Sequence, residues 1–195
     1  MGALKEYFRG YAAHAKWANG LMLQSMSAVS DEDYYRELIS GVRSMHDLMN
    51  HMIIMDELWV TELRQSAPKD EISSGDYILC GDRQTVLAVR AALDEQIEAC
   101  MQDVDEEALT GQIQYDEFGM EWPMWVEFAH VFRHQVHHRG QMSALIAALG
   151  LEPPKLDPMF FPPRAMSRGG AEYLAARAAA KAAQEAPQGS VLAGA

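Results

Sequence analysis

Apolar residues return at intervals of three and four along four stretches of the chain, which is the spacing of one buried helix face. Polar residues fill the positions between them, so each stretch predicts an amphipathic α-helix. The predicted helices cover residues 3–28, about 44–66, 83–103 and about 123–149. Four such helices with modest connections predict an all-α fold, a four-helix bundle of the antiparallel type.

Residues with known positional preferences mark where these helices begin and end. The second helix begins either at Ser44, where a capping-box pattern starts, or earlier, at Ser40. Asp82 is the expected N-cap of the third helix, and Pro123 is expected in the first turn of the fourth. Gly150 is expected as the C′ residue that ends the fourth helix.

Two further segments lie outside the predicted helices. Residues 110–122 alternate apolar and polar positions around a Phe118-Gly119 pair, which indicates a short β-hairpin between the third and fourth helices. Residues 166–195 are rich in alanine, with high helix propensity but little bulky apolar surface to bury. We therefore expect one bundle domain over residues 1–165 and a partly helical or disordered tail over residues 166–195.

The composition argues against several kinds of binding partner and cellular location. The 195 residues carry a net charge of −12 and no basic run, which argues against a nucleic-acid backbone as ligand. The sequence shows no targeting pattern and no long apolar span, so neither secretion nor membrane insertion is expected. The two cysteines, Cys80 and Cys100, form no CXXC motif, which fits a reducing cytoplasm.

Histidines gather in the predicted fourth helix, where His130 to His138 hold four of the seven in the chain. His134 and His138 are four residues apart on an apolar stripe, so both imidazoles point toward the core. The other members of that stripe are Val131, Met142, Leu145 and Leu149. An unpartnered imidazole is costly in a core, so the pair is either hydrogen-bonded or shares a metal ion. HEXXH proteases use this spacing for zinc, although their intervening glutamate is absent here.

A metal site needs a further ligand from another helix. His51 lies on the apolar stripe of the predicted second helix, whereas His46 lies off that stripe and is expected to face solvent. His130 is a rival third or fourth ligand because it precedes His134 by one turn. His137 is rotated by about 100° from the pair and is expected outside the site. Three neutral imidazoles with open coordination positions suit Zn²⁺ or Ni²⁺.

Two other kinds of active site disagree with the sequence. A di-iron carboxylate bundle needs two Glu-x-x-His motifs, and only Glu127 with His130 forms one. Neither cysteine has a recognisable histidine context and no GXSXG motif occurs, which argues against a serine or cysteine nucleophile. A mononuclear histidine site is the hypothesis that remains.

Taken together, these motifs resemble those of the DinB family. The matching segments are Trp17 to Asn19, Asn50-His51, Asp56 to Trp59, His134 to Gln141 and Gly150 to Phe161. The resemblance spans roughly residues 5–162 and leaves the alanine-rich tail outside. It implies a four-helix bundle with up-down-down-up connectivity, and a divalent metal ion bound by His51, His134 and His138.

The resemblance also implies a chemistry, because the superfamily contains low-molecular-weight-thiol transferases and a mycothiol-dependent maleylpyruvate isomerase. A metal ion lowers the pKa of a thiol, and the thiolate is the nucleophile. The favoured hypothesis is a cytoplasmic, metal-dependent S-transferase that joins a low-molecular-weight thiol to a small-molecule substrate. The alternatives are a metal-dependent hydrolase that activates water and a non-catalytic, metal-binding stress-response protein.

The apolar segment around Phe160 and the tail lie beyond the four helical stripes, which predicts a homodimer that covers them. Light scattering at high protein concentration should give twice the 21.8 kDa mass of one chain. A mass near that of the single chain would contradict the prediction.

Overall fold

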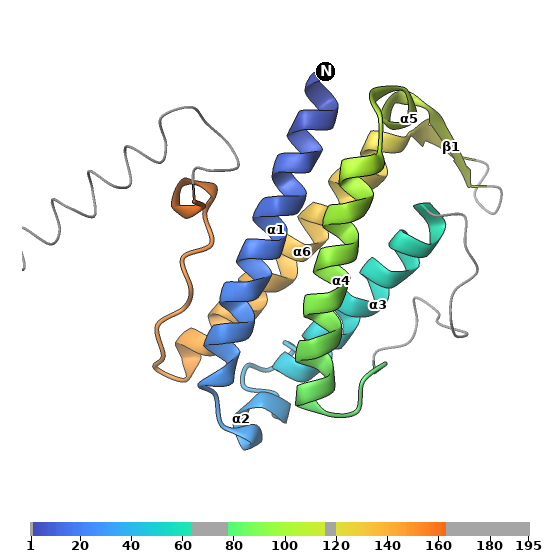
Figure 1. The fold of residues 1–195 in the computed structure, drawn as a ribbon. Coiled ribbons are helices and arrows are strands. Elements are labelled where there is room, and N and C mark those ends of the chain that lie inside the picture. Colours follow the sequence, from blue (N-terminus) through green and yellow to red (C-terminus); the bar gives the residue numbers. More distant parts are fainter. Residues whose placement is uncertain (1, 64–77, 116–119, 163–195) are drawn as a thin grey trace, which may run out of the picture. The chain divides into compact units, whose positions relative to one another are not determined.

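The computed structural model describes residues 2–63, 78–115 and 120–162, and Figure 1 shows its course. The chain forms two compact units, residues 1–158 and 159–195, and the bundle lies in the first. Of the second unit the structure describes residues 159–162, which include the end of the 3₁₀ helix η1 (Pro158–Phe160). The predicted tail, its boundary at residue 165 and residues 64–66 of the predicted second helix lie outside the described residues.

Four long helices form the bundle. They are α1 (Ala3–Ser27), α3 (Met45–Leu63), α4 (Arg83–Asp103) and α6 (Met124–Ala148). Helix α1 packs against α4 and α6, and α3 packs against the same two helices, so α1 and α3 lie diagonally across the bundle. In Figure 1, α1 and α6 run in one direction while α3 and α4 run in the other. The predicted all-α bundle with up-down-down-up connectivity is confirmed.

A two-stranded antiparallel sheet lies between α4 and α6 in the sequence, which confirms the predicted hairpin. Strand β1 (Gln112–Tyr115) pairs with β2 (Met120–Pro123). Helix α6 begins at Met124, whose main-chain N–H donates to the carbonyl oxygen of Gly111 at 2.8 Å. Pro123 therefore ends the strand and precedes the helix, one residue before the first-turn position that the sequence suggested.

The sequence does not predict two short helices, α2 (Asp31–Tyr35) and α5 (Glu106–Thr110). Each begins after an N-cap, Ser30 or Asp105, whose side chain accepts a main-chain N–H three residues later. Five residues are too few to show a repeating apolar stripe, so these acidic segments look like solvated connections. One side chain of each helix is nevertheless buried in the core: Tyr34 and Leu109.

Residues at the ends of the long helices explain where those helices begin and end. Ser44 Oγ accepts the main-chain N–H three residues later at 3.1 Å, so α3 begins just after Ser44. The alternative start at Ser40 is wrong because Ser40 lies in a turn beside Gly41, which has a φ of 79°. Asp82 caps α4 in the same way at 2.9 Å. Gly150 follows α6 with a φ of 75°, a conformation that glycine adopts without strain.

The apolar stripes of the helices meet in one core that is rich in methionine and aromatic side chains. Its buried members include Phe8, Met22, Met49, Met52, Leu93, Phe128 and Phe132. The ring of Phe128 lies 5.4 Å from that of Phe8 and 5.0 Å from that of Trp59, measured between centroids, so α1, α3 and α6 meet there. None of the described helices is both long and apolar enough to span a membrane.

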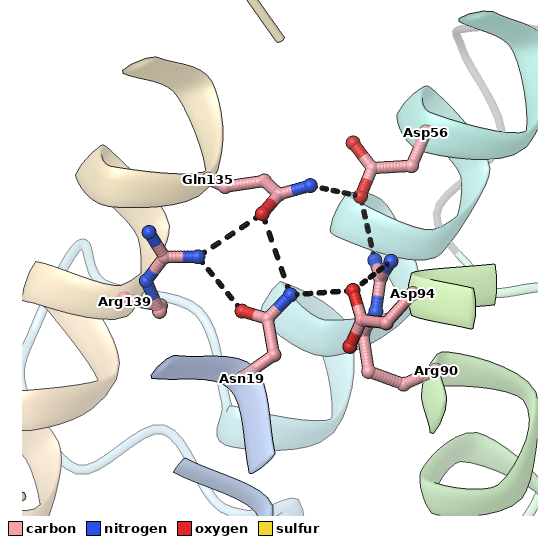
Figure 2. Close-up of polar contacts among 6 residues, drawn as sticks. All are labelled: Asn19, Asp56, Arg90, Asp94, Gln135 and Arg139. Carbon is pink, nitrogen blue, oxygen red and sulfur yellow. Dashed lines mark hydrogen bonds and ion pairs between the residues drawn. The ribbon is translucent and has the colours of Figure 1, made fainter. Parts of the chain in front are cut away.

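Six buried polar residues cross this core and join all four long helices (Figure 2). They are Asn19 on α1, Asp56 on α3, Arg90 and Asp94 on α4, and Gln135 and Arg139 on α6, and we call them the polar core network. The guanidinium of Arg90 donates to the Asp56 carboxylate at 2.6 Å and to the Asp94 carboxylate at 2.8 Å. One buried cation therefore bridges α3 and α4.

Two amide side chains extend the network to α1 and α6. Gln135 Nε2 donates to Asp56 at 2.7 Å, and Asn19 Nδ2 donates to Asp94 at 2.8 Å. Arg139 Nη1 donates to the amide oxygens of both, at 2.8 Å for Asn19 and 3.0 Å for Gln135. Each of the six side chains thus bonds to at least two others in the network.

Charge in the network is balanced when both carboxylates are ionised, because two guanidinium groups face them. Burial raises the pKa of Asp56 to about 6 and also raises the pKa of Asp94, while Arg90 opposes both shifts. Burial likewise lowers the pKa of Arg139 to about 10, still well above neutrality. Removing one charged member would leave a buried charge without its partner. This loss lowers the free energy of unfolding by more than the intact pair contributes to it.

Replacing Arg90 with methionine (Arg90→Met) should destabilise the protein by about 3–5 kcal/mol at neutral pH, because Asp56 and Asp94 lose the cation they share. Without it, the pKa of both carboxyls in the folded state rises further above the unfolded value. The folded variant then holds these protons more tightly, so its stability is greatest at low pH and falls as pH rises through the folded pKa. Urea denaturation at about pH 5 and about pH 7.5 measures this difference.

Lys16→Met is the matched control, because Lys16 also bridges two carboxylates, those of Glu95 and Glu98, but at the surface. Its loss should cost at most about 1 kcal/mol at either pH. Equal losses for the two variants, or an Arg90→Met loss that does not grow with pH, would contradict the role of the network.

Candidate metal centre

Three histidine side chains converge where α3 packs against α6. His51 comes from α3, and His134 and His138 come from successive turns of α6. Nε2 of His134 lies 3.2 Å from Nε2 of His51 and 3.0 Å from Nε2 of His138. The potential ligand atoms of the three residues all lie within 4.8 Å of one another. The structure therefore brings together the three histidines that the sequence indicated as a set.

The three imidazoles fit a single divalent ion. Zinc binds imidazole nitrogen at about 2.0–2.1 Å, which places two nitrogens of one tetrahedral site about 3.3–3.4 Å apart. Two of the three nitrogen separations, 3.2 Å between His51 and His134 and 3.0 Å between His134 and His138, are close to that value. Neutral imidazole is also a ligand type that Zn²⁺ and Ni²⁺ accept. His51, His134 and His138 are thus the residues that would hold such an ion.

Burial favours the neutral form of these rings, which is the form that binds metal. His138 is 8% exposed, and the other two are half-buried. Burial, reinforced by the neighbouring imidazoles, lowers the pKa of His134 to about 4. Burial also lowers the pKa of His51 and that of His138. At neutral pH an ion would therefore meet three uncharged rings.

His130 and His137 flank the cluster without joining it. The ring centroid of His130 is 5.9 Å from that of His134, and the centroid of His137 is 4.9 Å from that of His138. Both flanking side chains are exposed. Within the described ranges, the group at ligand distance consists of His51 with His134 and His138, so the structure does not place His130 as a third or fourth ligand. His137 lies outside the group, as its rotation around the helix predicts.

Two members of the polar core network lie next to histidines of this cluster along α6. Gln135 follows His134 and Arg139 follows His138 along α6, each rotated by about 100° toward the core. Because both network residues bond to partners on other helices, the face of α6 that carries the histidines is held in one rotation. The network thus supports the site without contributing a ligand to it.

Two of the six network residues could have been found in the sequence by a different signal. Arg90 and Asp94 fall on the apolar stripe of α4, at the spacing of Val86, Leu93 and Ile97. Charged residues at core positions of a helix are seldom buried without partners. Their positions therefore indicate buried ion pairs, although not which carboxylates or amides meet them.

The sequence predicts a solvent-facing His46, and the structure shows that this is wrong. His46 is 5% exposed, and its ring centroid lies 5.6 Å from that of Tyr34 and 4.8 Å from that of Tyr35. Both tyrosines belong to α2, the short helix that the sequence does not reveal. The first turn of α3 is therefore covered by α2 on the side that carries His46.

Asn50, the residue before the first histidine of the cluster, fixes the chain that leads into α4. Its Oδ1 accepts the main-chain N–H groups of Leu79 and Cys80 at 3.0 and 2.8 Å. Its Nδ2 donates to the carbonyl oxygen of Cys80 at 3.2 Å. A single buried amide thus takes the place of a strand partner for this segment and holds it against α3.

Two solved structures have the same fold. A conserved protein from Enterococcus faecalis superposes with a TM-score of 0.60 at 14% sequence identity, over 72% of this chain and 95% of that protein. A DinB-like protein from Bacillus cereus ATCC 10987 superposes with a TM-score of 0.54 at 22% identity, over 71% of this chain and 90% of that protein. At these identities the likeness shows the fold alone.

The sequence comparison is more specific. No curated protein matches the chain significantly. The model of the DinB family, however, matches residues 4–169, which include all the motifs described above and the three converging histidines. The predicted resemblance is confirmed, and the chain belongs to the DinB family.

Proposed function

We propose that this protein is a divalent-metal-dependent enzyme that transfers a low-molecular-weight thiol to a small electrophilic substrate. The observation that carries the proposal is the convergence of three imidazole nitrogens at a position that is only half-buried. His51 and His134 are only half-buried, which supports access of a small molecule to the cluster. Membership of the DinB family is consistent with a metal at this position.

The number of protein ligands supports a catalytic rather than a structural site. Structural zinc sites are usually closed by four protein ligands, whereas catalytic sites use three and leave a position for water or substrate. In the described part of the chain, the group at ligand distance has three members, all histidines. Three neutral ligands also leave the ion's full double charge uncompensated, which favours an anion in the open position.

Thiol chemistry suits these features. When bound, a divalent ion would supply the Lewis acidity that ionises a thiol at neutral pH. The sulfur forms a bond to an electrophilic carbon of the substrate, and the leaving group departs with its bonding electrons. The thiol proton passes to the exposed imidazole of His130 or of His137, which lie beside the cluster, and from that ring to solvent.

One observation favours the non-catalytic alternative. The cluster joins two different helices, so an ion there would cross-link α3 to α6 and stabilise the folded state. A metal-dependent hydrolase is the other alternative, because the same open position would accept water. The response of the metal to a thiol distinguishes these functions.

In protein loaded with Co²⁺, glutathione, cysteine or 2-mercaptoethanol should produce a sulfur-to-cobalt charge-transfer band, because the open position admits sulfur. The same thiol should react with 1-chloro-2,4-dinitrobenzene orders of magnitude faster than without protein, and only with metal present. His134→Ala should abolish both the band and the acceleration. His137→Ala should leave the band unchanged, since its ring lies outside the cluster.

Two results would contradict the proposal. A cobalt spectrum that no thiol alters, with a melting temperature that falls when metal is removed, would favour a structural ion. An unaltered spectrum together with metal-dependent cleavage of ester or amide model substrates would favour a hydrolase.

A further inference from the structure

We infer that Gln141 is a positioning residue that holds His138 in the one neutral tautomer able to bind a metal through Nε2. This inference rests on the proposed metal site. It concerns a residue outside the three ligands and assigns it a defined chemical task.

The contact that carries the inference is a short hydrogen bond within α6. Gln141 Oε1 lies 2.7 Å from Nδ1 of His138, three residues earlier in the helix. Positions three apart lie on the same face of a helix, so the two side chains meet without distorting it. His138 is 8% exposed and Gln141 is half-buried, so bulk water competes weakly for this bond.

The direction of the bond fixes the proton. An amide oxygen can only accept a hydrogen bond, so Nδ1 of His138 must carry the hydrogen. In a neutral imidazole the other nitrogen then has a free lone pair, and that nitrogen is Nε2. This is the atom that faces Nε2 of His134 at 3.0 Å, inside the cluster.

The other tautomer would disable the site. With the hydrogen on Nε2, His138 would direct an N–H group at the nitrogens of His134 and His51 and could not donate a lone pair to an ion. A half-turn of the ring about the Cβ–Cγ bond would put Cδ2 in the place of Nδ1 and Cε1 in the place of Nε2, so the cluster would lose this ligand atom. The bond to Gln141 opposes both changes, because each of them removes the donor from the amide oxygen.

Metal sites in other proteins show how large such an effect is. The nitrogen of a ligating histidine that does not bind the metal usually donates to an oxygen, which orients the ring and makes the other nitrogen more basic. Loss of such a partner typically weakens metal affinity by about 10–100-fold. Gln141 is placed to do this for His138.

The tautomer can be measured in the metal-free protein by two-bond ¹⁵N–¹H correlation spectra of the histidine rings. The wild type should show His138 with its hydrogen on Nδ1. Gln141→Leu removes the acceptor and should shift His138 toward the Nε2–H form, whereas Gln141→Glu keeps an oxygen acceptor and should retain Nδ1–H. A wild-type His138 with its hydrogen on Nε2, or a tautomer that Gln141→Leu leaves unchanged, would overturn the inference.

Zn²⁺ affinity, measured by competition with a chelator, gives a second readout. Gln141→Leu should bind Zn²⁺ about 10–100-fold more weakly than the wild type, and Gln141→Glu should bind at least as tightly as the wild type. The matched control is Gln24→Leu, the same substitution at an exposed position of α1, which should not change the affinity. Thermal melting of each variant establishes that it is folded.

These measurements separate the inference from the function on which it rests. Suppose that neither the wild type nor any variant binds Zn²⁺, while Gln141→Leu still shifts the tautomer of His138. The role of Gln141 then stands, and the proposed metal-dependent function fails. If the wild type binds Zn²⁺ and Gln141→Leu binds it equally well, the metal site stands and the role of Gln141 is wrong.

Discussion

Burial of four opposing charges at the centre of the bundle is the constraint that orders the other features of this protein. Arg90 between Asp56 and Asp94, with Arg139 held by two amides, satisfies the charges only if all four helices arrive in one register. An apolar core tolerates small shifts of one helix along another, whereas a buried ion loses its partner. The network therefore favours one arrangement of the four helices over shifted ones.

The histidine cluster follows from that arrangement. Gln135 and Arg139 alternate with His134 and His138 along α6, so the rotation that satisfies the network also turns both imidazoles toward His51 on α3. One face of α6 is thus fixed by buried hydrogen bonds, and the neighbouring face carries His134 and His138. Rigid elements that carry a partly exposed site are the general pattern for sites that need accurate geometry.

Much of this could be predicted from the sequence, because helical periodicity places residues on faces. The spacing of His134 and His138 identifies the helix face that both occupy, and the apolar stripe of its helix does the same for His51. The resemblance to the DinB family then favours His51 over His130 as the third ligand. Periodicity cannot show which faces of different helices meet. The prediction for His46 failed for this reason, since α2 covers that face and is too short to show a pattern. The partners of Arg90 also depend on tertiary packing.

The metal content of the His51→Ala variant is the decisive quantity for the histidine site, because His51 is the only member of the cluster that comes from α3. Wild-type protein equilibrated with Zn²⁺ and passed through a desalting column should retain about one ion per chain by elemental analysis. His51→Ala should retain little, and His130→Ala should match the wild type. Retention of a full equivalent by His51→Ala, with unchanged affinity, would show that α3 contributes no ligand and that the three histidines do not form one site.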